Sequence, residues 1–421
     1  MTASLPTTHT PEATFDQRIR ALDGIRGLAL IQVLLIHFAI LNEVPETTVV
    51  DKVVGQVWDA GWIAMDSFFV LSGFLITGIL YEAKSAKIRH YFRNFYVRRS
   101  LRIFPAHYVY LLALLILLPF IMPEEKRAIE AIRQDWWWFA TYLGNIRLVL
   151  DYGRRPDVFF TSHLWSLSVE EQFYLVWPVV VLLLGRAKLM VFCVFISLVA
   201  LFTRIGMVLA GVNAWVPYEL TLTRMDSLAI GALVAIAVRD PHDLLWLKRW
   251  FPQIAVVSAA LIAIPALILG ELYLFGDWEI AIVHTPLSVL YGLLIFYFVT
   301  GVRGGKLERA FSQPFLVRLG RYSYAMYLWH LAVAYFLFAN FSIGTHVPTL
   351  FGSHLPGAIT FAVAAFIPTY SIGWLSWNFI EAPALGLKRH FPYTAGETAA
   401  RHNASEPASP PSAAPASARG D

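Results

Sequence analysis

About ten long apolar stretches recur along the sequence, and they constrain its fold more than any other feature. Each is close to the roughly 20 residues that an α-helix needs to cross a bilayer. The stretches are residues 24–41, 62–81, 104–122, 164–184, 189–210, 222–238, 252–269, 280–300, 322–341 and 357–379. Only 15% of the residues are charged, against about 25% in soluble globular proteins. The sequence therefore predicts an all-α polytopic integral membrane protein, a bundle of about ten transmembrane helices.

The distribution of Lys and Arg predicts the topology of these spans. With the N-terminus in the cytoplasm, most of the 33 Lys and Arg residues fall in segments on the cytoplasmic side. We therefore expect an even number of spans, both termini in the cytoplasm, and a location in the cell inner (cytoplasmic) membrane. The one long outside segment, residues 123–163, contains three consecutive tryptophans from Trp136. It predicts an interfacial or re-entrant helix with the tryptophans at headgroup level.

Composition predicts one membrane domain between two tails. Residues 1–18 are expected to form a cytoplasmic tail, residues 19–390 the membrane domain, and residues 391–421, rich in Ala, Pro and Ser, a disordered cytoplasmic tail. No small-residue cleavage site follows the first apolar stretch, which is expected to stay as an anchor. The net charge of +4 reflects the Lys and Arg residues of the predicted cytoplasmic loops. The expected partner is therefore the lipid bilayer, and no nucleic-acid partner is expected. No zinc-type spacing or phosphate-binding glycine loop is present, so no metal is predicted.

Two polar residues of the first span, Arg26 and His37, lie eleven positions apart. Eleven steps come within roughly 20° of three helical turns, so both side chains face the same way, ~16 Å apart along the axis. An ionisable residue inside the membrane is by default a functional-site hypothesis. The alternative is that Arg26 reaches to the interface while His37 is a packing residue.

Topology brings further charged residues from other spans to the depth of His37. They are Asp66, Glu170, Glu171, Arg224 and Asp226. A histidine among carboxylates is a typical general-base arrangement, and the alternative is a buried ion-pair network that holds helices together. Glu170 follows His163 by seven residues, nearly two helical turns, so we expect both to face the bundle. Glu170 is therefore predicted to pair with His37, and Glu171 to be structural, bonded to another span or to loop backbone.

The predicted cytoplasmic segment from Lys84 to Arg102 is rich in basic and aromatic residues. Arg98, Arg99 and Arg102 fall at helical spacing just before a span, where arginine suits phosphate recognition. The alternative is that they serve topology and bind anionic lipid headgroups. In the ninth span His330 lies in an aromatic stripe, which more often indicates packing than chemistry.

These motifs together resemble the acyltransferase 3 family of integral membrane O-acyltransferases. The resemblance covers about residues 19–389 and follows the family's order of motifs. The motifs are Arg26-x10-His37, FFVLSGFLI from Phe68, RRSLRIFPAHY from Arg98, WSLSVEEQFYL from Trp165, RMDSLAIG from Arg224 and SYAMYLWH from Ser323.

The resemblance implies transfer of an acyl group from cytoplasmic acyl-CoA, first of all acetyl-CoA, to a hydroxyl of a cell-surface glycan, lipid-linked saccharide or glycosylated metabolite. Acyl-CoA is then a co-substrate, and no bound cofactor is expected. The resemblance points to His37 as the catalytic residue and leaves open whether it acts as a base or carries the acyl group. Some members have a fused esterase-type domain. This sequence shows none, so we expect it to complete transfer itself or with a separate esterase-fold partner.

A mechanism consistent with these depths places the CoA phosphates on Arg98, Arg99 and Arg102 and the CoA arm on Arg26. Glu170, Glu171 or Asp66 would orient His37. Residues of the other motifs are expected to bind substrate: His163, Trp165, Glu171, Arg224, Asp226 and His330, with Arg224 at the oxyanion. The rival from another class is a transporter or flippase of a glycan or glycolipid, whose intramembrane charges line a solute path. Against it, the sequence shows no internal repeat and no evident pair of broken helices.

Overall fold

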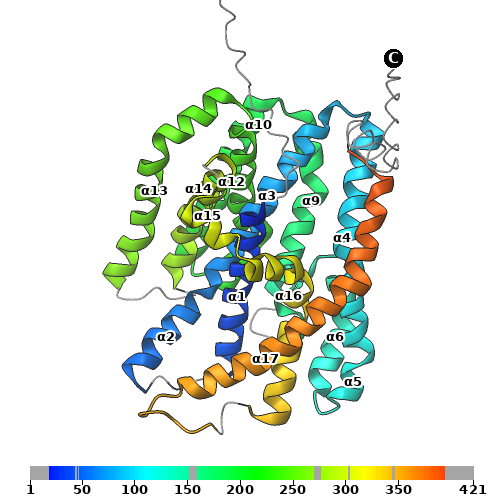
Figure 1. Cartoon of the computed structure of the whole chain (residues 1–421), viewed down its shortest axis with the longest axis vertical. Coiled ribbons are helices and arrows are strands. Elements are labelled where there is room, and N and C mark those ends of the chain that lie inside the picture. Colours follow the sequence, from blue (N-terminus) through cyan, green and yellow to red (C-terminus); the bar gives the residue numbers. More distant parts are fainter. Residues whose placement is uncertain are drawn as a thin grey trace, which may run out of the picture.

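The computed structural model describes residues 19–42, 45, 47–150, 159–269, 276–301, 304–343 and 347–393. The predicted tails, residues 1–18 and the part of the C-terminal tail after residue 393, lie outside the described residues. Within these ranges the chain consists of helices and their connections, which confirms the predicted all-α class (Figure 1).

Eight described helical segments are long and apolar enough to cross a membrane. Their main helices are α1 (Arg20–Asn42), α3 (Ala64–Glu82), α9 (Trp165–Leu183), α10 (Arg186–Leu209), α13 (Pro241–Leu269), α14 (His284–Thr300), α16 (Pro314–Phe341) and α17 (Leu355–Ser376). The other two predicted spans correspond to α4 (Ile88–Ile116) and α12 (Thr221–Ala237). α12 has only 17 residues, and the first half of α4 carries most of the arginines of the basic segment. Both are therefore weaker spans by length or composition than the sequence indicated.

The segment predicted to lie outside, residues 123–163, contains three short helices in its described part. They are α6 (Lys126–Ala140), α7 (Gly144–Leu150) and α8 (Phe159–Ser162), and α5 (Leu118–Ile121) directly precedes them. α6 packs on α4, where the Tyr108 hydroxyl donates a hydrogen bond to the Ala140 oxygen at 3.0 Å. Trp136 and Trp137 are nearly half exposed on α6. The predicted helix is thus confirmed, and its place at headgroup level stays a prediction.

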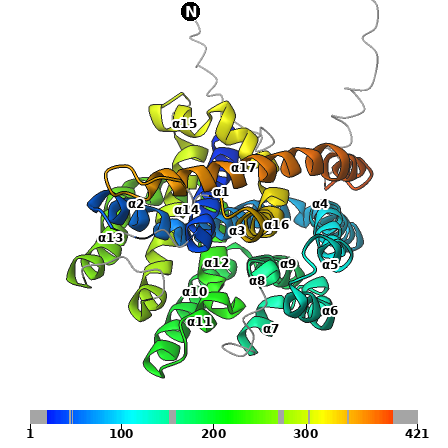
Figure 2. The same ribbon diagram turned by 90° about the horizontal axis from the view of Figure 1, so that it is seen from below.

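Glycine contacts bring four helices at the centre of the bundle into direct backbone contact. A Cβ on Gly27 of α1 would lie 2.1 Å from the Leu316 oxygen of α16, so only a glycine fits there. A Cβ on Gly73 of α3 would lie 1.9 Å from the Leu228 oxygen of α12. Small residues allow this close approach between membrane helices. Figure 2 shows α1 in the middle of the bundle, with α13 on one side and α4 to α6 on the other.

Of the chain segments predicted to face the cytoplasm, the connections that follow α3, α9 and α12 lie at the top of Figure 1, whereas α15 (Lys306–Phe311) lies near mid-height in that view. Lys84 Nζ donates to the Leu184 oxygen at 2.7 Å, and Arg186 lies 3.2 Å from Asp240. These contacts place the ends of α3, α9 and α12 and the start of α10 at the same end of the bundle. Which end faces the cytoplasm stays a prediction from the charge distribution.

Candidate active site

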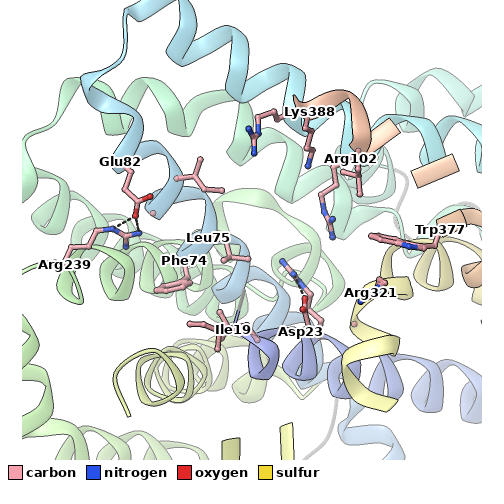
Figure 3. A pocket seen from close by; sticks show the side chains of 17 residues that line it. Ile19, Asp23, Phe74, Leu75, Glu82, Arg102, Arg239, Arg321, Trp377 and Lys388 are labelled. Atoms are coloured by element: carbon pink, nitrogen blue, oxygen red, sulfur yellow. Dashed lines mark hydrogen bonds and ion pairs between the residues drawn. The ribbon is translucent and has the colours of Figure 1, made fainter. Parts of the chain in front are cut away.

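A basic cavity of about 800 Å³ opens at this end of the bundle. Its charged lining residues are Asp23, Arg26, Glu82, Arg98, Arg102, Arg239, Arg321 and Lys388. Both carboxylates already contact arginines: Asp23 lies 3.5 Å from Arg26, and Glu82 accepts a hydrogen bond from Arg239 at 3.2 Å. Figure 3 shows Arg102, Arg321 and Lys388 on the side of the cavity opposite the Glu82–Arg239 pair. The excess of positive charge suits an anionic ligand.

A second, smaller chamber of about 100 Å³ lies next to the basic cavity. Arg26 and Arg102 line both, so the two spaces meet at this pair of arginines. The other polar lining residues of the chamber are Ser72, Arg99, Ser166, Glu170, Tyr174, Ser323, Tyr324 and Tyr327. Arg26 and Arg102 can therefore contact a ligand from either space.

Arg98, Arg99 and Arg102, at the start of the third predicted span, do not all line the same cavity. Arg99 lines the inner chamber, with its guanidinium 5.2 Å from the ring centre of Tyr174. Arg98 lines only the basic cavity, where it donates to the Phe391 oxygen at 3.1 Å and lies 4.3 Å from the ring centre of Tyr393. Arg98 therefore also holds the C-terminal segment, a role that sequence reasoning missed.

Glu170 lies in the chamber and does not pair with His37. The Ser72 hydroxyl donates to Glu170, and the Tyr174 hydroxyl donates to Ser72 at 2.9 Å. The expected relation between His163 and Glu170 assumed one continuous helix, but α9 begins only at Trp165 and His163 lies in the preceding turn. The seven-residue spacing therefore does not put the two side chains on one helix face.

Glu171 does not form the predicted bond to another span or to loop backbone. Its Oε1 is buried and has no hydrogen-bond partner in the described part of the chain. The adjacent Gln172 makes the structural contacts instead, since its Nε2 donates to the Tyr142 oxygen and to Asn145 Oδ1, both at 2.9 Å. The sequence analysis missed Gln172 because a single amide in a span carries no pattern of its own.

Asp66 belongs to a separate, fully buried network. Arg224 Nη2 lies 2.8 Å from Asp66 Oδ1, and His284 Nδ1 lies 2.9 Å from Asp66 Oδ2. Next to them Arg204 Nη2 lies 2.7 Å from Asp226 Oδ2. Asp66 thus orients His284 rather than His37, and this buried network matches the alternative of ion pairs that hold helices together. His284 was missed because no motif or spacing distinguishes it.

Several predicted substrate-binding residues line neither cavity. Arg224 and Asp226 are held in the buried network, which argues against the predicted substrate contact and oxyanion role. Trp165 packs its ring against Phe69 at 5.9 Å and Tyr218 at 4.8 Å between ring centres. These residues therefore support the walls of the site.

Three histidines meet behind the wall of the chamber. His330 Nε2 lies 3.1 Å from His37 Nδ1, and the His163 and His330 rings are 5.2 Å apart between centres. The Tyr327 hydroxyl donates to the His163 oxygen at 2.6 Å and lies 2.7 Å from Ser166 Oγ. Tyr327 and Ser166 line the chamber, so the histidine cluster adjoins it through these two residues. His330, for which the sequence favoured packing and the resemblance implied substrate binding, lines neither cavity and directly contacts His37.

Comparisons with known proteins identify the family. A family model described as an acyltransferase domain matches residues 19–378. The O-acetyltransferase OatA of Staphylococcus aureus (strain NCTC 8325 / PS 47) is 29% identical over 378 residues, covering 86% of this chain and 56% of that protein. The putative O-acetyltransferase SACOL0978 of S. aureus (strain COL) is 26% identical over 384 residues, 87% of this chain and 57% of that protein. The chain thus spans little more than half the length of these curated relatives. From the match over most of its length, the chain belongs to the acyltransferase 3 family of membrane acyltransferases.

Proposed function

We propose that the chain is a membrane O-acetyltransferase that takes an acetyl group from acetyl-CoA on the cytoplasmic side. The acceptor is a hydroxyl of a cell-surface glycan, a lipid-linked saccharide or a glycosylated metabolite. The observation that carries this proposal is the basic cavity that shares Arg26 and Arg102 with an inner chamber, whose lining residues Ser166 and Tyr327 adjoin the histidine cluster around His37. The relatives named as O-acetyltransferases support the same reaction.

The two cavities suit the two ends of acetyl-CoA. The phosphates of the nucleotide end match the arginines and Lys388 of the larger cavity, because guanidinium groups bind phosphate oxygens in a fixed, often bidentate geometry. The chamber, at about 100 Å³, is far smaller than the basic cavity. A short acyl group such as acetyl suits this space better than a long acyl chain.

The chemistry uses His37 as the general base. As the acceptor oxygen attacks the thioester carbon, His37 removes the hydroxyl proton. The carbon–sulfur bond then breaks, and the leaving sulfur takes the proton to give free CoA. In the alternative acyl-carrier route, the same lone pair of His37 attacks the thioester carbon. His37 is then acetylated before the acetyl group passes to the acceptor. Trapping of label on the protein in the absence of acceptor distinguishes the two routes.

The test is an assay of purified protein in detergent with radiolabelled acetyl-CoA and a panel of oligosaccharides. Acetyl transfer, with CoA release that depends on the added saccharide, supports the enzyme. Saccharide movement across reconstituted vesicles without any CoA release would favour the transporter. Mass spectrometry of surface glycans and secreted metabolites from a deletion strain then identifies the acceptor.

A further inference from the structure

The hydrogen bonds of His37 determine which of its nitrogens carries hydrogen. His37 Nδ1 lies 2.8 Å from the Val33 oxygen of its own helix and 3.1 Å from His330 Nε2. A backbone carbonyl only accepts hydrogen bonds, so Nδ1 of the neutral ring carries the hydrogen. The lone pair is then on Nε2, for which the described residues provide no hydrogen-bond partner. Nε2 is therefore the nitrogen available to take a proton.

The hydrogen bonds of His330 determine in the same way which of its ring nitrogens carries hydrogen. His330 Nδ1 lies 2.5 Å from the Tyr327 oxygen, so Nδ1 carries the hydrogen and Nε2 carries the lone pair. That lone pair faces the N–H of His37, which is shared between His330 Nε2 and the Val33 oxygen. His330 is fully buried, so water does not compete for this bond.

A catalytic histidine is often oriented by a carboxylate, but none of the described carboxylates has this role beside His37. Within the described ranges, no Asp or Glu side chain hydrogen-bonds to His37: Glu170 binds Ser72, and Asp66 binds His284. His163 does not compete either, because its Nε2 lies 3.0 Å from the Leu328 oxygen and only its ring packs against His330. Among the described residues, His330 is thus the single side chain that hydrogen-bonds to the His37 ring.

We propose that His330 is the positioning residue of the acetyl transfer reaction, an inference that rests on the proposed function above. Together with the Val33 oxygen, it accepts the Nδ1 hydrogen of neutral His37 and fixes the orientation of the ring, so that Nε2 is the base. When Nε2 takes the proton of the acceptor hydroxyl, the charged ring donates a stronger hydrogen bond from Nδ1 to His330. The hydroxyl oxygen bonds to the acetyl carbon, the carbon–sulfur bond breaks, and the sulfur takes the proton from Nε2. The Nδ1 hydrogen stays on His37 throughout.

Two substitutions separate this role from packing. His330→Leu fills much of the same volume without an acceptor, whereas the amide oxygen of His330→Gln can take the place of Nε2. With acetyl-CoA as the donor and, as the acceptor, the oligosaccharide of the panel that supports CoA release, we expect H330L to lower kcat for CoA release at least ~10-fold, part of the contribution of a general base. The KM for acetyl-CoA stays within about twofold because the donor contacts are made elsewhere. H330Q should recover most of the kcat.

The matched control is His107→Leu. His107 is a buried histidine that is bonded to the Phe139 oxygen at 3.1 Å and lines neither cavity.

A double-mutant cycle tests whether His330 acts through His37. In a His37→Ala background, H330L should cause no further loss, because the residue that it positions is gone. Independent, multiplicative losses would overturn the proposal, as would wild-type kcat in folded H330L or equal losses in H330L and H330Q.

A spectroscopic measurement tests the proposal without turnover. In protein labelled with ¹⁵N-histidine, the ring-nitrogen shifts of His37 should show hydrogen on Nδ1 in the wild type, and the Nδ1 shift should move in H330L because one of the two acceptors of that hydrogen is lost. Unchanged shifts in H330L would overturn the positioning role. If the wild-type protein bound acetyl-CoA but released no CoA, the proposed function would fail, and these shifts would still decide the role of His330.

Discussion

Replacing Arg102 by Gln is expected to weaken acetyl-CoA binding far more than replacing Arg98. Arg102 lines both cavities at the point where they meet, whereas Arg98 lines only the outer one and is held by the Phe391 oxygen and the Tyr393 ring. A hydrogen bond to a charged group contributes about 1.5–3 kcal/mol, and each 1.4 kcal/mol is a factor of ten. We therefore expect R102Q to raise the KM for acetyl-CoA roughly 10- to 100-fold, and R98Q to raise it by less than about fivefold.

The assay is the initial rate of CoA release against acetyl-CoA concentration, with kcat and KM fitted separately. The kcat of R102Q should stay within a few-fold of wild type, because phosphate binding contributes equally to the ground state and the transition state. Arg249→Gln is the matched control, since Arg249 lies outside both cavities, beside the Trp250 ring. An unchanged KM in folded R102Q, or an effect of R98Q as large as that of R102Q, would refute donor binding at the Arg26–Arg102 junction.

Three further predictions follow from the fold. Gly27→Ala places a methyl group 2.1 Å from a backbone oxygen of α16 and should lower the Tm measured by thermal unfolding in detergent. Gly185→Ala, whose methyl group would have no atom within 4 Å, should leave the Tm unchanged. Asp66→Asn leaves a buried arginine unpaired and should destabilise the protein by about 3–5 kcal/mol, measured as loss of folded protein on denaturant titration. Reporter fusions at Asp51 and Lys306 should report opposite sides of the membrane; the same side for both would refute the topology.

The sequence predicted the helical membrane fold because long apolar runs have few alternative structures in a bilayer. It also singled out Arg26 and His37, since a polar residue in a span is conspicuous. The structure places Arg26 where the two cavities meet and His37 beside the inner one. The arrangement of helices in the plane of the membrane does not follow from hydropathy, which reports depth alone.

The incorrect pairings predicted for His37 arose because hydropathy reports the depth of a residue in the membrane and not which helices are neighbours. Asp66 and Glu170 were expected near His37 because they share its depth, but they lie on helix faces that meet His284 and Ser72 instead. For His330 the sequence favoured packing, with substrate binding only implied by the resemblance, since an aromatic stripe looks the same whether or not a second histidine faces it. Only the contact between α1 and α16 shows that it does. Lateral neighbours depend on tertiary packing, so sequence periodicity could not provide them.

The central claim is that His37 transfers an acetyl group from CoA, and the most direct measurement is CoA release by His37→Ala and His37→Gln at saturating acetyl-CoA. Both variants should lose at least ~10²-fold in kcat, the low end for a general base. Binding of acetyl-CoA to the basic cavity should stay near wild type in each, measured by its shift of the Tm. Substantial turnover by either variant, in protein that still binds acetyl-CoA, would contradict the account and place the chemistry on another residue.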